Sequence, residues 1–138
     1  LIVKRIKMSI SEYFKNFGEK EFRLIEEKTI LDLLDANSKK IFAFGGGAFQ
    51  SFRVRQIVKK NAISIWLKCD LKTLAFRCSR KKNRPLLQDK NIKSVLKELN
   101  KLRADNFAKA NYIFNVSKKT KSKLTNEIID KLNLNENY

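Results

Sequence analysis

Three short apolar segments alternate with stretches of helical periodicity, and this alternation constrains the fold more than any other feature of the chain. The apolar segments are Ile41–Phe44, Ala62–Leu67 and Tyr112–Val116. Short, continuously apolar segments are typical of strands that are covered on both faces, as in a parallel sheet. Strands that alternate with helices predict an α/β fold with right-handed crossover connections.

Hydrophobic spacing and capping residues predict the elements between these strands. Ser9 and Glu12 have the spacing of a capping box, in which each side chain bonds the backbone N–H of the other residue. Gly18 is a natural stop for the helix that they start, and Asp70 is a natural N-cap. The predicted helices are Ser11–Phe17, Glu19–Leu34, Phe52–Lys60, Leu71–Arg80, Ile92–Ala110 and Ser122–Leu132, with polar turns at Asp35–Lys40 and Ser79–Lys90.

The length of 138 residues predicts one domain, 1–138, that can bury a real core. No apolar run approaches the roughly 18 residues of a membrane span, and the start of the chain has no signal-peptide pattern. We therefore expect a cytoplasmic protein without a membrane partner. The absence of His excludes a Ser–His triad and a His metal site within this chain. Cys69 and Cys78 form neither a C-x-x-C motif nor a disulfide framework, which favours reduced thiols.

The net charge of +17 favours polyanionic partners, from nucleic acids to nucleotides and small anionic substrates. A composition rich in lysine throughout the chain is the plainer explanation. No basic run is interleaved with aromatic residues that could stack on bases, so we expect no nucleic-acid partner. A basic nucleic-acid-binding module is nevertheless kept as an alternative.

Three of the four glycines, Gly45–Gly47, directly follow the first apolar segment. Ligands of parallel α/β sheets bind beyond the carboxyl ends of the strands. Glycine permits positive φ and lets a ligand approach the bare backbone, so three together can form a surface rich in N–H donors. A tight strand-to-helix turn would also explain them.

Three arginines stand in distinctive settings. Arg23 and Glu26 share a helix face, so the carboxylate can hold the guanidinium fork ready for a planar anion. Arg84 stands beside the only proline, Pro85, which suits a lid that delivers positive charge to a phosphate. Arg103 lies in the long predicted helix. Each arginine also has a plainer explanation. Arg23 and Glu26 could form an ordinary exposed ion pair, Arg84 could lie in a solvated surface loop, and Arg103 could be an exposed helical residue.

A set of short motifs occurs in one order along the chain: Ser9–Phe14, Gly18-Glu19, Phe22-Arg23, Ile25–Glu27, Gly45–Ala48, Trp66-Leu67, Arg84–Leu87, Arg103 and Ala110. As a set they resemble the shikimate kinase family over Ile2 to Val116. The resemblance implies a three-layer α/β/α fold of the P-loop, nucleoside-monophosphate-kinase-like kind with a five-stranded parallel sheet. It also implies transfer of the ATP γ-phosphoryl group to the 3-hydroxyl of shikimate, a step of aromatic amino acid biosynthesis in the chorismate pathway.

The resemblance further implies roles for individual residues. Arg23 and Arg103 would clamp the shikimate carboxylate, and Glu26 would orient Arg23. The backbone of Gly45–Gly47, chiefly Gly46, would contact the ring hydroxyls. The other implied contacts are Phe14, Phe22, Pro85 and Leu86 around the pocket, Arg84 of a lid segment 79–91 on the phosphates, and Arg77 and Lys119 near the adenine.

Two departures from the family pattern stand out. The chain lacks the Gly-x-x-x-x-Gly-Lys-Ser/Thr loop and the Asp-x-Asp segment before the first matching helix. We expect both motifs, and with them the first strand and the Mg²⁺ ligands, to lie upstream of Leu1, and we predict that this chain alone is inactive. Phe107, where the family usually has Tyr, is a minor difference. A monomer is expected, and a related gluconate-type kinase stays as a further alternative.

Overall fold

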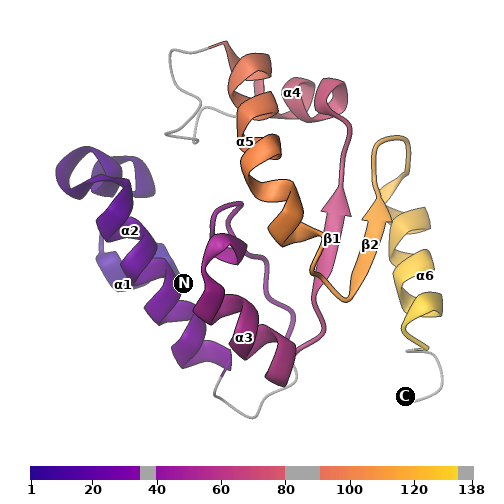
Figure 1. Ribbon diagram of the computed structural model, residues 1–138, viewed down its shortest axis with the longest axis horizontal. Helices are drawn as coiled ribbons and strands as arrows, with labels where there is room; N and C mark the ends of the chain where they lie inside the picture. Colours follow the sequence, from indigo (N-terminus) through magenta and orange to yellow (C-terminus); the bar gives the residue numbers. More distant parts are fainter. Residues whose placement is uncertain (35–39, 80–90, 134–138) are drawn as a thin grey trace.

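The computed structural model describes residues 1–34, 40–79 and 91–133, which form helices around a parallel pair of strands (Figure 1). In β1 and β2, Ile65 lies opposite Tyr112 and Lys68 lies opposite Asn115. The parallel α/β architecture predicted from the alternation of strands and helices is therefore confirmed. The elements are α1 (Ile2–Ile6), α2 (Ile10–Leu34), the 3₁₀ helix η1 (Ala48–Gln50), α3 (Phe52–Asn61), β1 (Ile65–Lys68), α4 (Leu71–Ser79), α5 (Ile92–Phe107), β2 (Tyr112–Asn115) and α6 (Lys121–Lys131).

The start, break and end that the sequence predicts for the first helical region are all present in the structure. The Ser9 N–H donates to the Glu12 carboxylate at 2.8 Å, and the Glu12 N–H donates to the Ser9 hydroxyl at 3.2 Å, which completes the capping box. Gly18 interrupts α2 with φ 80° and ψ 173°, a conformation that belongs almost only to glycine. The second part of α2 ends at Leu34, as predicted.

A buried hydrophobic cluster joins α2 and α3 beneath the glycine turn. Its members are Ile30, Leu34, Ala48, Val54 and Val58, and the partly buried Phe42, Phe44, Phe49, Ile57 and Ala62 pack against it. Figure 1 shows α2 and α3 on one side of the paired strands and α6 beside β2 on the other. The core thus fixes the glycine turn to the helix that carries Arg23.

The prediction of a strand at Ile41–Phe44 is wrong. This segment has no backbone hydrogen-bond partner among the described residues and is not a strand. Phe42 and Phe44 pack against the core, whereas Ile41 and Ala43 are exposed, so only one face is covered. A run of apolar residues reports burial, but it does not report whether a neighbouring strand can pair with its backbone.

The second predicted strand, Ala62–Leu67, is shorter and later than expected, because β1 is Ile65–Lys68. It is not buried on both faces either, since Ile63 is 62% exposed and Leu67 is 51% exposed. Its one hydrogen-bonded neighbour in the described part of the chain is β2, so within that part its other backbone edge is also unpaired.

Helix α1 was not predicted, because five residues carry too little periodicity to be recognised. Tertiary contacts hold it against α2: the Arg5 guanidinium donates to the Asp32 carboxylate at 2.7 Å and to the Thr29 hydroxyl at 3.2 Å. Isolated helices of this length are unstable in water, so packing decides whether they form. The turn at Asp35–Lys40 and the loop at Ser79–Lys90 fall almost wholly outside the described residues.

Asp70 caps α4 as predicted, with the Thr73 N–H and the Thr73 hydroxyl each donating to its carboxylate at 2.8 Å. The Thr73 N–H first, and then the Ser117 hydroxyl, lower the pKa of Asp70 from 3.8 to about 2. A carboxyl group whose pKa is lowered by folding stabilises the fold above its unfolded pKa and loses that effect as pH falls through its folded pKa.

The stabilisation from Asp70 should therefore be nearly complete above about pH 5 and be lost progressively as pH falls from about 5 through 2. Asp70→Asn keeps a good N-cap but removes the titrating group. In urea unfolding, the variant should lose less stability than the wild type between pH 5 and 2.5. Glu98→Gln, at an exposed position of α5, is the matched control. Equal losses in Asp70→Asn and the wild type would contradict the assignment.

Candidate functional site

Three side chains from two distant helices, α2 and α5, lie against the turn at Gly45–Gly47. A Cβ atom added to the first glycine would lie 2.6 Å from a Glu26 carboxylate oxygen, and one on the second 3.3 Å from an Arg103 nitrogen. A Cβ on the third would overlap the Arg23 guanidinium. None of the three has positive φ, so close approach, rather than an unusual backbone conformation, is what requires glycine here.

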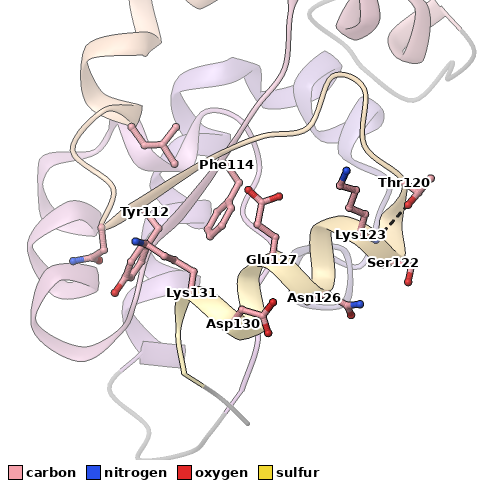
Figure 2. A pocket seen from close by; sticks show the side chains of 11 residues that line it. Tyr112, Phe114, Thr120, Ser122, Lys123, Asn126, Glu127, Asp130 and Lys131 are labelled. Atoms are coloured by element: carbon pink, nitrogen blue, oxygen red, sulfur yellow. Dashed lines mark hydrogen bonds between the residues drawn. The ribbon is translucent and has the colours of Figure 1, made fainter.

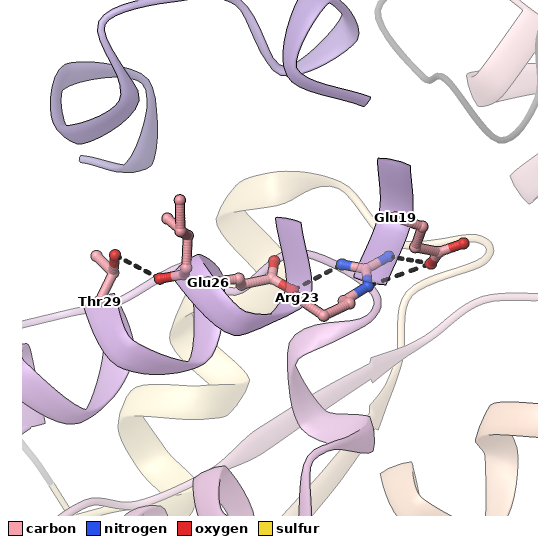
Figure 3. Close-up of polar contacts among 5 residues, drawn as sticks. Glu19, Arg23, Glu26 and Thr29 are labelled. Atoms are coloured by element: carbon pink, nitrogen blue, oxygen red, sulfur yellow. Dashed lines mark hydrogen bonds and ion pairs between the residues drawn. The ribbon is translucent and has the colours of Figure 1, made fainter. Parts of the chain in front are cut away.

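Arg23 is held between two carboxylates of its own helix (Figure 3). Its guanidinium donates to Glu26 at 2.6 Å and to Glu19 at 2.8 and 3.2 Å. Glu26 is only 2% exposed, whereas Glu19 is exposed. Burial alone would lower the pKa of the Arg23 guanidinium, but the hydrogen bonds to Glu19 and Glu26 outweigh it and raise the pKa above its ordinary value. The side chain is thus a permanently charged group in a fixed place.

Phe14 and Phe22 form an aromatic wall beside Arg23. The two ring centroids are 4.8 Å apart, and the central guanidinium carbon lies 6.0 Å from the Phe14 centroid and 5.4 Å from the Phe22 centroid. At these distances a guanidinium is attracted to the ring face. The predicted pocket residues Phe14 and Phe22 therefore lie next to the predicted anchor.

Arg103 comes to the turn from α5 and differs from Arg23 in its partners. It is half-buried, and within the described residues its guanidinium has no hydrogen bond and no ion pair. Burial, and after it the like charge of Arg23, lower the pKa of Arg103 below its ordinary value. Two guanidinium groups at one turn, one of them without a partner, form a site that an anion would complete, and a planar carboxylate matches their forked donors.

The remaining predicted residues lie elsewhere. Arg77 donates from α4 to the Val116 carbonyl at 3.3 Å, and Lys119 forms an ion pair with Glu127 of α6. Val116 directly follows β2 and Lys119 lies between β2 and α6, so both side chains lie near the carboxyl end of β2. Arg84, Pro85 and Leu86, with nearly all of the lid segment 79–91, fall outside the described residues.

Sequence reasoning missed two contacts of this site. Glu19 was given no contact with Arg23, although its i,i+4 spacing to Arg23 is a direct signal for an ion pair. The hydrogen bond from Asn106 to Gln50 joins α5 to η1 and has no local signal, because the two residues are 56 positions apart.

A broad, open hollow lies away from the arginines, between β2 and α6 (Figure 2). Lys123, Asn126, Glu127 and Asp130 of α6 line it together with Tyr112 and Phe114 of β2. No predicted site residue lines this hollow. The described residues contain no group of three or more side chains that could hold a metal ion, and they form no helix that is long and apolar enough to cross a membrane.

The fold and the site define an α/β protein of the P-loop kinase-like class, and comparison with solved structures agrees. The chain is similar to a shikimate kinase from Acinetobacter baumannii solved in complex with shikimate, with a TM-score of 0.91, 27% identity, and coverage of 99% of this chain and 76% of that one. A shikimate kinase from Bacteroides thetaiotaomicron shares the fold, with a TM-score of 0.82, 22% identity and coverage of 98% and 79%.

The family model for shikimate kinase matches residues 1–133, and the chain belongs to the shikimate kinase family. It is 43% identical over 128 residues to the shikimate kinase of Bartonella henselae, covering 93% of this chain and 60% of that protein. It is 44% identical over 102 residues to the enzyme of Caulobacter vibrioides, covering 74% of this chain and 50% of that protein. The chain thus spans about 60% of the length of the first of these relatives.

Proposed function

We propose that this chain forms the shikimate-binding part of a shikimate kinase, which transfers the ATP γ-phosphoryl group to the 3-hydroxyl of shikimate. The observation that carries the proposal is that Arg23 and Arg103, far apart in the sequence, lie against the same bare glycine turn. The Acinetobacter baumannii relative, solved with shikimate, supports it. No observation on the described residues favours a nucleic-acid-binding module or a gluconate-type kinase.

In this proposal the two guanidinium groups bind the substrate carboxylate and the turn binds the ring. The N–H group of Gly46, which is exposed, has no hydrogen-bond partner among the described residues, so it is free to donate to a hydroxyl oxygen. Phe14 and Phe22 flank the carbon skeleton, and Glu26 holds Arg23 in place. Phosphoryl transfer depends mainly on positioning and charge, which is what these groups supply.

ATP with Mg²⁺ is the phosphoryl donor that the proposal requires. The chain has no Gly-x-x-x-x-Gly-Lys-Ser/Thr loop, and the described residues hold no cluster of metal ligands. These residues therefore do not fit the triphosphate or its metal ion, and no step is assigned to them there. Arg77 and Lys119 near the adenine, and Arg84 on the phosphates, stay predictions, as do a monomeric state and a cytoplasmic location.

Calorimetry of the chain with shikimate and with its methyl ester tests the proposal. Both ligands offer the same ring hydroxyls, but only shikimate carries a carboxylate. Shikimate should bind, and the ester should bind at least about tenfold more weakly, because it loses a charged hydrogen-bond acceptor. Equal affinities, or no binding of shikimate, would overturn the proposal.

Arg23→Lys should weaken shikimate binding about tenfold. The planar guanidinium can donate to Glu19, Glu26 and the substrate carboxylate at the same time, and an ammonium group cannot replace that geometry. Arg5→Lys is the matched control, since Arg5 pairs with Asp32 on the α1 side of α2. Titration of both variants with shikimate measures the effect. An unchanged affinity in Arg23→Lys would argue against the carboxylate role.

A further inference from the structure

Two side-chain amides connect the helix that carries Arg103 to the glycine turn. The Asn106 side-chain amide donates to the Gln50 side-chain carbonyl at 2.8 Å. Gln50 is the last residue of η1, and its backbone N–H donates to the carbonyl of Gly47 at 3.0 Å. Asn106 lies three residues after Arg103 on α5, close to the same helix face. The hydrogen bond between the two side-chain amides is therefore a direct connection between the turn and α5, the helix that carries Arg103.

Neighbouring groups fix both amides in this connection. The Arg55 guanidinium donates to the backbone carbonyls of Phe49 and Gln50, each at 2.8 Å, which holds the η1 backbone. The Lys109 ammonium donates to the Asn106 side-chain oxygen at 3.1 Å, which leaves the Asn106 nitrogen facing Gln50. The Gln50 side-chain nitrogen is buried and has no hydrogen-bond partner in the described part of the chain.

An amide whose buried NH2 group has no hydrogen-bond partner among the described residues is costly in free energy, so packing alone would favour an apolar side chain at this position. The two arginines also differ in what positions them. Arg23 is held by two carboxylates, whereas Arg103 has no side-chain partner among the described residues. The position of the Arg103 guanidinium over Gly46 therefore depends on where α5 sits relative to the turn.

We propose that the Gln50–Asn106 amide pair is a positioning element that sets the distance between Arg103 and the glycine turn. The inference rests on the proposed function, because it takes the Arg103 guanidinium as a ligand of the substrate carboxylate. Neither amide touches the substrate in this scheme. They act through α5, and in enzymes a misplacement of only about 1 Å caused by a distant substitution can cost about a hundredfold in rate.

Two variants break the pair, and one double variant restores it. Gln50→Met and Asn106→Leu each remove the hydrogen bond between the two side-chain amides with little change in side-chain size. The exchanged pair, Gln50→Asn with Asn106→Gln, keeps two neutral amides of the same combined length. Asn100→Leu, at an exposed position of the same helix, is the matched control.

Shikimate affinity, measured by calorimetry, should fall about tenfold in each single variant, recover to within about threefold in the exchanged pair, and be unchanged in Asn100→Leu. A purely structural role predicts a different result: a lower unfolding midpoint in the single variants, with unchanged affinity of the folded protein. That result, or an exchanged pair as weak as the single variants, would overturn the proposal.

The NMR signal of the Arg103 side-chain Nε–H separates this inference from the proposed function, because it needs no ligand. We expect one narrow signal at the same position in the wild type and the exchanged pair, and a shifted or broadened signal in both single variants. If shikimate fails to bind the wild type, the proposed function fails, and this signal still tests the positioning role. A signal that is identical in all variants would overturn it.

Discussion

Replacing Arg103 with methionine is expected to weaken shikimate binding about a hundredfold while leaving the fold at least as stable as before. The loss of affinity follows from the loss of a forked, charged donor to a carboxylate, because a hydrogen bond between charged groups contributes about 1.5–3 kcal/mol. Methionine keeps an unbranched stem of similar length, so packing on α5 is preserved.

We expect Arg103→Met to lose shikimate affinity without losing stability. Burial and the like charge of Arg23 lower the pKa of Arg103, which means that its charged form is disfavoured in the folded state. No described residue forms an ion pair with it. Removing such a charge removes a cost, so the urea midpoint of Arg103→Met should stay level or rise. Sites that bind ligands often keep groups that destabilise the free protein.

Arg53→Met is the control for a change of charge alone. Arg53 lies on α3, is exposed and forms only a 3.4 Å ion pair with Glu27, so its removal should not change shikimate affinity. Calorimetry and urea unfolding of both variants give the comparison. If Arg103→Met bound shikimate like the wild type, the carboxylate site would not be at the turn. If its midpoint fell together with its affinity, partial unfolding would explain the loss.

Features that depend on neighbours in the sequence could be predicted. The capping box at Ser9 and Glu12, the break at Gly18 and the cap at Asp70 all form within a few residues, and each is present in the structure. The predicted strand at Ile41–Phe44 depended instead on a partner that periodicity cannot report. Local signals therefore gave most helix boundaries, whereas pairing between strands required the structure.

The candidate site divides in the same way. The contact between Arg23 and Glu26 follows from their spacing on one helix, and it is present at 2.6 Å. The approach of Arg103 to Gly46 could be expected only from the family resemblance, because the two segments meet through tertiary packing. The Gln50–Asn106 bond had no signal at all in a single sequence. The turn needs glycine for side-chain space, which the sequence could not distinguish from a need for positive φ.

Gly47→Ala should reduce shikimate affinity about fiftyfold, because the new Cβ would occupy the place of the Arg23 guanidinium. The backbone itself tolerates alanine, since Gly47 has φ −99° and ψ −20°. Arg23 must therefore move, and its bonds to the buried Glu26 carboxylate are stretched. We expect a stability loss of about 1 kcal/mol, within the usual range for a single substitution.

Gly18→Ala is a control that should lose a comparable amount of stability but keep its affinity for shikimate. At φ 80° and ψ 173° an alanine is strained by roughly 1–3 kcal/mol, yet nothing lies within 4 Å of its added Cβ. Its shikimate affinity should stay within about threefold of the wild type. Measured together at a temperature where both variants are folded, the two separate loss of stability from loss of the guanidinium position. Equal affinities in the two variants would mean that the place of Arg23 over the turn does not matter for binding.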